Sequence, residues 1–219
     1  MASAETSTTE VTLTLPDATL EGFLALPAEA TGIVVFAHGS GSSRFSSRNR
    51  AVAEYLNESG LGTLLFDLLT ADEHQVDQQT RELRFDIPLL SRRLGGAVQW
   101  LEEREDTRQL SVGLFGSSTG AAAALIAAAA NPERVAAVVS RGGRPDLAGD
   151  SLGKVKAPTL LIVGGRDTQV IEMNREAAER LTCYHRIGIV KGATHLFEEP
   201  GTLEQVEQLA ADWFNQYLQ

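Results

Sequence analysis

Two adjacent serines lie between glycines in segment 116–120, which reads Gly-Ser-Ser-Thr-Gly. An apolar run, 110–115, precedes it and an alanine-rich run, 119–130, follows. The segment matches the pattern G-x-S-x-G with Ser118 at its centre, and its strand-to-helix setting predicts a sharp turn that exposes one hydroxyl. The glycines remove side chains that would collide at such a turn. We therefore expect Ser118 to be a nucleophile; the alternative is a small-residue turn that only lets a buried helix pack closely.

A serine hydroxyl needs a base to take its proton and a carboxylate to hold that base in the right tautomer. Asp167 and His195 each follow a short apolar run in the second half of the chain. The order serine, aspartate, histidine is the one expected when a nucleophile elbow is built on an α/β sheet. Two alternatives stay open: Asp167 could cap the helix that follows it, and Glu198 or Glu199 could orient the histidine.

Two backbone N–H groups are candidates for stabilising an oxyanion. Thr119 opens the predicted helix, where N–H groups point at a developing negative charge. The loop after the first buried apolar run reads His38-Gly39-Ser40-Gly41, and the N–H of Ser40 is our second candidate. A phosphate-binding loop is the competing interpretation, but Arg44 occupies the place of the third glycine in G-x-G-x-x-G. We expect His38 to brace this loop.

Arginines cluster behind two predicted strand ends. Arg44, Arg48 and Arg50 follow the glycine loop, and Arg141 and Arg144 follow another strand. A guanidinium pairs well with a carboxylate, so Arg44 and Arg141 are candidates for contact with an anionic substrate group. The alternative is that these arginines pair with the chain's 29 acidic residues and brace loops.

Short apolar runs alternate with helical patterns along the chain. In the last helix, Thr202 and Gln205 predict a capping box, and Asp86 predicts the start of an earlier helix. The alternation predicts an α/β fold with a mostly parallel sheet, opened by a β-hairpin and covered by helices on both faces. Ligands of such sheets bind at the carboxyl ends of the strands. The predicted strands are 11–15, 20–26, 32–37, 61–66, 110–115, 135–140, 159–164 and 187–190.

Length and charge narrow the class of protein. The 219 residues suit one domain over 11–219 after a flexible N-terminus of residues 1–10. A net charge of −10 argues against nucleic acid and anionic membranes as partners. Segment 67–77 holds acids and His74 without metal-ligand spacing, so we expect a solvated loop and no metal site there. Acyl transfer by a serine, a histidine and a carboxylate requires no cofactor, so we expect none. The first ten residues lack a signal peptide pattern and the chain has one cysteine, so we expect a cytoplasmic protein.

The chain resembles the α/β-hydrolase superfamily, and within it the short dienelactone-hydrolase-like members. The motifs HGSG, GSSTG, GGRD and GATH carry the resemblance, which spans residues 11–218. It implies that Ser118 is the nucleophile, Asp167 the acid and His195 the base. Dienelactone hydrolases proper have a cysteine at the elbow, so the serine favours general ester hydrolysis. Segment 141–158 is too short for the helical cap that many members insert, which implies a lidless, open site.

These features predict a serine hydrolase that cleaves small carboxylic esters or lactones through an acyl-enzyme. The expected partner is a small-molecule ester or lactone. Two other classes stay open: a peptidase or acyltransferase that uses the same triad, and a non-catalytic relative that only binds a small molecule in the cleft.

Overall fold

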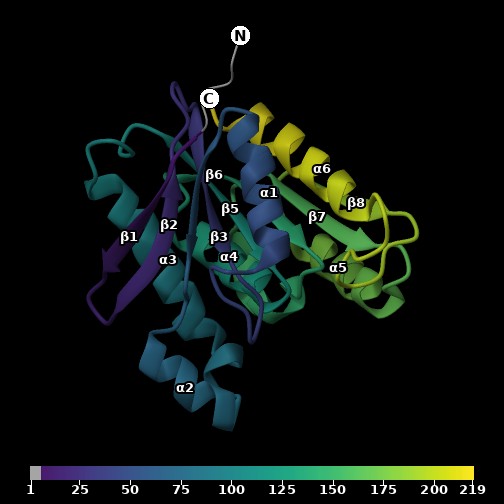
Figure 1. The fold of residues 1–219 in the computed structure, drawn as a ribbon. Coiled ribbons are helices and arrows are strands. Elements are labelled where there is room, and N and C mark those ends of the chain that lie inside the picture. The colour runs from purple at the N-terminus through teal and green to yellow at the C-terminus, as the bar shows by residue number, and fades with distance from the viewer. Residues whose placement is uncertain (1–5) are drawn as a thin grey trace.

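The computed structural model describes residues 6–219, which form one eight-stranded sheet with helices on both faces (Figure 1). Its strand order is β1-β2-β4-β3-β5-β6-β7-β8. The pairs β1–β2 and β2–β4 are antiparallel, and the other pairs are parallel. The mostly parallel sheet opened by a hairpin is thus confirmed. The strands are β1 (Thr8–Thr14), β2 (Thr19–Ala25), β3 (Gly32–Ala37), β4 (Gly62–Phe66), β5 (Ser111–Ser117), β6 (Val135–Arg141), β7 (Thr159–Gly164) and β8 (His185–Val190).

Helices bury both faces of the sheet. One face is covered by α1 (Ser47–Glu58) and α6 (Thr202–Tyr217), which pack side by side. The other face is covered by α3 (Ile87–Glu103), α4 (Thr119–Ala130) and α5 (Thr168–Arg180). Every residue of β3 and β4 is buried, because a central parallel strand covered on both sides has no solvent face.

The long helix α3 begins where the sequence predicts. The Asp86 carboxylate accepts a hydrogen bond from the Leu89 N–H at 3.0 Å, and Pro88 lies in the first turn. A proline there loses no hydrogen bond, because the first N–H groups of a helix have no intrahelical acceptor. The apolar stripe of α3 is buried on the sheet and comprises Leu90, Leu94, Val98 and Leu101.

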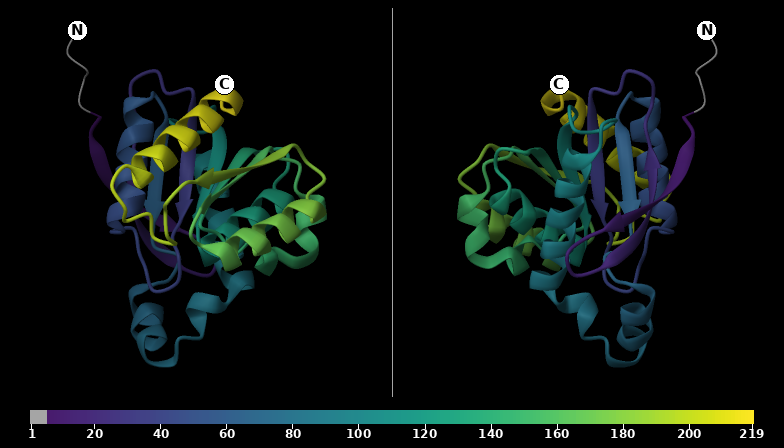
Figure 2. Two further views of the ribbon diagram at one scale, coloured as in Figure 1. Left: turned by 90° about the vertical axis from the view of Figure 1, so that its right-hand side faces the viewer. Right: turned by 90° about the vertical axis from the view of Figure 1, so that its left-hand side faces the viewer.

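A helical arm follows β4 and projects beyond the edge at which the parallel strands end (Figures 1 and 2). It contains α2 (Ala71–Thr80) and the 3₁₀ turn η1 (Leu83–Phe85). The expected loop over 67–77 is therefore wrong from Ala71 onward. A capping box starts the helix: the Thr70 hydroxyl accepts from the Glu73 N–H at 3.2 Å, and the Glu73 carboxylate accepts from the Thr70 N–H at 2.8 Å.

Two other sequence expectations need correction. Strand β1 begins at Thr8, which pairs with Ala25, so residues 8–10 belong to the hairpin instead of a flexible N-terminus. Residues 1–5 of that expected terminus lie outside the described residues. At α6, the predicted capping box is absent because Gly201 is the N-cap and the Thr202 hydroxyl donates to the Glu199 carbonyl at 2.7 Å.

The connection between β6 and β7 holds the 3₁₀ segment η2 (Pro145–Lys154), which packs against α4 and α5. This packing places η2 on one face of the sheet, so it forms no helical cap over the ends of the strands. Among residues 6–219, every helix is too short or too polar to cross a lipid bilayer.

Candidate active site

The turn between β5 and α4 isolates Ser118. Its backbone has φ 51° and ψ −121°, a region that L-residues rarely adopt and that costs about 1–3 kcal/mol. A Cβ on Gly116 would lie 2.4 Å from the Ala121 Cα, and one on Gly120 would lie 2.2 Å from the Ala37 carbonyl oxygen. Neither contact is sterically possible, so the glycines of the motif are required for this turn.

The two adjacent serines have different surroundings. The Ser117 side chain is buried, donates a hydrogen bond to Asn49 Oδ1 at 3.0 Å and accepts one from Arg141 Nη2 at 2.9 Å. Both serines line a cavity of about 220 Å³, but Ser118 is only partly buried. Ser118 is therefore the hydroxyl of the pair that a ligand can reach. The cavity is lined by Gly39, Ser40, Ser42, Ser46, Arg48, Asn49, Ser117, Ser118, Arg141, His195 and Leu196.

His195 and Asp167 form a direct pair in this structure. The distance from His195 Nδ1 to Asp167 Oδ2 is 2.6 Å. Because a carboxylate only accepts, Nδ1 carries the proton and Nε2 of a neutral imidazole is left as the basic nitrogen. Gly142, at φ 52°, lies against the ring, since a Cβ there would be 3.5 Å from His195 Cε1. Asp167 is the N-cap residue of α5, but its side chain makes no capping hydrogen bond. Its carboxylate instead binds His195.

The other acids considered for this role have different partners. The Glu199 carboxylate accepts hydrogen bonds from the Thr194 hydroxyl and from the Thr194 N–H at 3.1 Å, and these bonds hold the pKa of Glu199 below its usual value. The exposed Glu198 lies 3.8 Å from Arg48 Nη1. Neither orients His195.

The structure brings Ser118 and His195 to one cavity without a hydrogen bond between them among the described residues. Catalytic hydrogen bonds are often long when no substrate is bound and shorten in the reacting complex. The strand ends of β5, β7 and β8 thus bring the three predicted residues to a single edge of the sheet.

The two expected oxyanion donors flank Ser118. A Cβ on Gly39 would lie 3.3 Å from the Ser118 Cβ, so the Gly39–Ser40 segment passes close to Ser118. Ser40 lines the cavity. Thr119 is the first residue of α4, and its N–H is one of the helix N–H groups without an intrahelical acceptor. Ser40 and Thr119 therefore both lie beside Ser118 in this structure.

A model of the dienelactone hydrolase family matches residues 20–219. The chain belongs to the dienelactone hydrolase family. The crystal structure of a dienelactone hydrolase from Anabaena variabilis is 57% identical, with a TM-score of 0.97 over 99% of this chain and 100% of that chain. Est1E from Butyrivibrio proteoclasticus is 16% identical, with a TM-score of 0.78 over 94% of this chain and 98% of that one, and shares the fold.

Two curated relatives come from Mycobacterium tuberculosis, strains CDC 1551 and H37Rv. Each is 59% identical over 197 residues and carries the provisional name phosphoribosyl transferase. The match covers 90% of this chain and 44% of each relative. This chain therefore spans less than half the length of those relatives, and their name describes a longer protein.

The two candidate substrate arginines differ in position. Arg44 pairs with Asp67, to which its own backbone N–H also donates at 2.7 Å, and its guanidinium stacks on Phe45 at 4.4 Å. It lines a separate cavity of about 380 Å³, so the structure places it outside the Ser118 cavity. Arg141 lines the Ser118 cavity. Burial, together with the nearby Arg48, lowers the pKa of Arg141 to about 10.

Sequence reasoning missed Asn49, whose side chain joins both Ser117 and Arg141 from α1. Its Oδ1 accepts from the Ser117 hydroxyl at 3.0 Å and from Arg141 Nη2 at 3.2 Å. Asn49 lies in the first turn of α1, and its N–H donates to the N-cap hydroxyl of Ser46 at 3.3 Å. A capping serine is visible in the sequence, but the contact with the elbow, 68 residues away, has no local signal.

Proposed function

We propose that this protein is a serine hydrolase that cleaves small carboxylic esters or lactones through an acyl-enzyme on Ser118. The observation that carries the proposal is the 2.6 Å bond between His195 and Asp167 beside a strained, cavity-facing serine. Family membership supports a hydrolase, and the relative from Anabaena variabilis, described as a dienelactone hydrolase, supports lactones and esters. The name phosphoribosyl transferase belongs to proteins of which this chain spans 44%, and we do not extend it to this chain.

In the proposed acylation, His195 Nε2 takes the proton of Ser118 as Oγ attacks the ester carbonyl carbon. Asp167 holds the imidazole and stabilises the imidazolium that forms. The N–H groups of Ser40 and Thr119 donate to the oxyanion of the tetrahedral intermediate. When the intermediate collapses, the carbon–oxygen bond to the leaving group breaks and His195 gives its proton to the departing alkoxide. The acid portion stays bound to Ser118 as an ester.

Deacylation uses the same groups with water as the nucleophile. His195 takes a proton from water, the hydroxide attacks the acyl carbon, and the oxyanion again accepts from Ser40 and Thr119. Collapse breaks the bond to Ser118, whose oxygen takes the proton back from His195. The product is a free carboxylic acid.

The size of the site favours small substrates. The cavity beside Ser118 has about 220 Å³, below the range of sites that enclose drug-sized ligands. The connection between β6 and β7 adds no helical cover that would shield a long acyl chain from water. Short or exposed esters therefore fit this site better than long lipid chains.

The surroundings of Arg141 favour a substrate that carries an anionic group. It is 7% exposed, its pKa of about 10 keeps it cationic at neutral pH, and no carboxylate pairs with it among residues 6–219. Its Nε is buried without a hydrogen-bond partner in the described structure. A buried charge without a counter-ion is unfavourable, so a carboxylate on the substrate would be stabilised there. Arg44, which already has Asp67, is not proposed for this role.

The function is tested with a panel of short aryl esters and lactones, assayed on wild type, Ser118→Ala and Asp167→Asn. We expect no turnover by Ser118→Ala and a fall in kcat of about 10³- to 10⁴-fold for Asp167→Asn. Glu199→Gln is the matched control and should stay near wild type. Turnover of peptides or acyl transfer to added alcohols instead of hydrolysis would favour the other triad enzymes. Near-normal turnover by Asp167→Asn would contradict its role.

The anionic substrate group is tested with pairs of esters that differ only by a terminal carboxylate. Arg141→Met should lower kcat/KM for the anionic ester about tenfold or more relative to its neutral partner, because a charged hydrogen bond is lost. The matched variant Arg44→Met should leave that ratio unchanged. An unchanged ratio in Arg141→Met would overturn the assignment.

A further inference from the structure

The loop that carries Ser40 is tied to the neighbouring strand end by one imidazole. His38 follows β3 and is 8% exposed. Its Nδ1 lies 2.9 Å from the Gly39 carbonyl oxygen, and its Nε2 lies 3.1 Å from the N–H of Leu68, which follows β4. The side chain therefore bridges two loops that are 30 residues apart in the sequence.

These two contacts fix the tautomer of His38. A backbone N–H can only donate, so the Nε2 that faces Leu68 must be unprotonated. The proton is then on Nδ1, which donates to the Gly39 carbonyl. Burial has the largest influence on the pKa of His38 and lowers it; the hydrogen bond to Gly39 and the charge of Asp67 oppose this lowering, and His74 adds to it. The imidazole is thus neutral and has one donor and one acceptor, both in use.

The Gly39 carbonyl and the Ser40 N–H belong to one peptide group. That carbonyl also accepts from the Ser42 N–H at 3.1 Å, so two donors fix its direction. In a planar trans peptide the N–H points opposite to the carbonyl, and the described chain has no cis peptide. The Ser40 N–H therefore points away from His38. Ser40 lines the Ser118 cavity, whereas His38 does not; the two residues share only a much smaller cavity of about 10 Å³.

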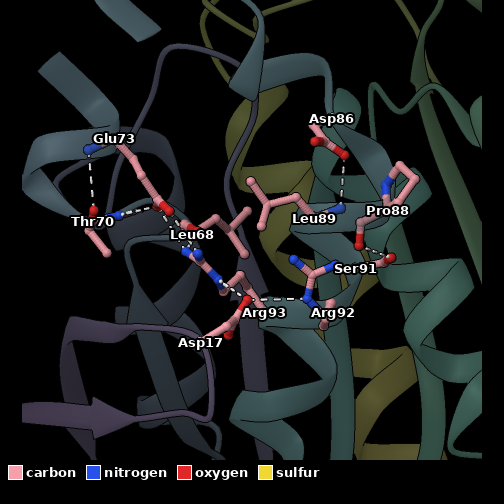
Figure 3. A network of polar contacts seen from close by, with 10 residues as sticks. All are labelled: Asp17, Leu68, Thr70, Glu73, Asp86, Pro88, Leu89, Ser91, Arg92 and Arg93. Carbon is pink, nitrogen blue, oxygen red and sulfur yellow. Dashed lines mark hydrogen bonds and ion pairs between the residues drawn. The ribbon is translucent and has the colours of Figure 1, made fainter. Parts of the chain in front are cut away.

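The far end of the bridge is itself firmly held. The Leu68 carbonyl accepts from Arg93 Nη1 at 3.1 Å, and the guanidinium of Arg93, 3% exposed, is bound by Glu73 and Asp17 (Figure 3). Bidentate pairing fixes a guanidinium in plane as well as in position. His38 thus connects the Ser40 loop to a network that spans the hairpin, α2 and α3.

We propose that His38 is a positioning residue, whose Nδ1–H holds the Gly39–Ser40 peptide so that the Ser40 N–H faces the oxyanion formed at Ser118. The proposal rests on the proposed function, because it needs a tetrahedral intermediate at Ser118. His38 takes no part in proton transfer, since both its nitrogens are occupied by the backbone.

Two conservative variants separate the donor from the acceptor. In His38→Asn the side-chain amide sits where Nδ1 was and donates to Gly39, whereas in His38→Gln the amide reaches the place of Nε2 and accepts from Leu68. We expect kcat of His38→Gln to fall about ten- to hundredfold with KM within about twofold, since a misplaced oxyanion donor acts on the transition state. We expect His38→Asn to recover kcat to within about threefold of wild type, although it leaves Leu68 unpaired and lowers Tm.

The matched control is His74→Gln, which removes a partly exposed imidazole from the cavity that His38 also lines and should leave kcat unchanged. An activity order that follows Tm, with His38→Asn less active than His38→Gln, would overturn the proposal. Wild-type kcat in both variants would do the same.

Two readouts keep this test separate from the ester assignment. A fluorophosphonate forms a tetrahedral adduct on Ser118 without any ester substrate. The rate of this phosphonylation should rank the His38 variants in the same order as kcat does. A wild type that is phosphonylated but hydrolyses no ester contradicts the proposed substrate class alone. The second readout is the tautomer of His38 in the wild type. Its ¹⁵N imidazole chemical shifts should show a protonated Nδ1 and an unprotonated Nε2 between about pH 6 and pH 8, the range in which an ordinary histidine titrates. A protonated Nε2 would contradict the positioning role.

Discussion

The two sides of the Ser118 cavity are positioned by different physics. On the elbow side, Gly116 and Gly120 have no room for a methyl group, and close backbone packing holds Ser118. On the Ser40 side, the loop is held by hydrogen bonds through His38 to the network of Arg93. Steric positioning requires small residues at fixed spacing, so it is visible in the sequence as a local motif. Polar positioning joins residues that are far apart in the sequence, so no local motif indicates it.

Filling the elbow should give the largest effect. Gly116→Ala places a methyl group 2.4 Å from the Ala121 Cα, and a backbone clash of this kind costs about 3 kcal/mol or more. We expect the free energy of unfolding, measured with denaturant, to fall by that amount and activity to be lost. The control is Gly95→Ala, where the new methyl group meets Asn131 Nδ2 at an ordinary 3.6 Å. Equal stability of the two variants would contradict the steric explanation of the turn at Ser118.

Weakening the polar side should have a smaller effect. Glu73→Gln removes the carboxylate that binds Arg93 at 2.8 and 2.9 Å, and we expect it to lower the free energy of unfolding by about 2 kcal/mol. Hydrogen exchange should increase in α2 more than at the elbow, because the bonds lost join α2 to α3. The exposed Glu176 provides the control, Glu176→Gln. Uniform loss of protection across the molecule would show that the two sides are not held separately.

The difference in stability between wild type and Glu73→Gln should depend on pH, and the pKa of Glu73 gives the direction. The hydrogen bonds of Glu73 with Arg93 hold its pKa below the usual 4.5, so the folded state favours the charged form. The stabilisation is complete above the usual pKa and is lost as pH falls through the lowered pKa of the folded state. The stability difference between wild type and Glu73→Gln should therefore be constant near neutrality and shrink as the pH falls below 4.5. A difference that grows on acidification would contradict this account.

Backbone strain at the elbow gives the smallest expected effect. Ser118→Gly and Ser118→Ala both lose the hydroxyl, but only glycine adopts φ 51° without a steric penalty. We expect the glycine variant to be more stable by about 1 kcal/mol. Denaturant melts of the two variants measure the difference directly. A more stable alanine variant would mean that the turn is not strained.

The fold was predictable because its signals are local. The strands 32–37 and 159–164 were predicted with the observed ends, since buried parallel strands are continuous apolar runs. Asp86 was also read correctly as an N-cap. Capping boxes show the limit: the true one at Thr70 and Glu73 was overlooked in an acidic segment, and one was predicted at Thr202 where Gly201 begins the helix.

The placement of the candidate site residues was predictable because motif order reflects sheet topology, and their catalytic roles stay predictions. Ser118, Asp167 and His195 follow strands that end at one edge, and the structure brings them together. Side-chain partners over long separations were not predictable. Arg44 was a candidate for substrate contact because nothing local indicates its pairing with Asp67.

The central claim is that Ser118, and not its neighbour Ser117, is the nucleophile. The most direct measurement is peptide mass spectrometry of the protein after reaction with a fluorophosphonate. The account predicts a single adduct on Ser118, with loss of hydrogen fluoride from the reagent, and no adduct in Ser118→Ala. An adduct on Ser117, full labelling of Ser118→Ala, or an unlabelled wild type would contradict it.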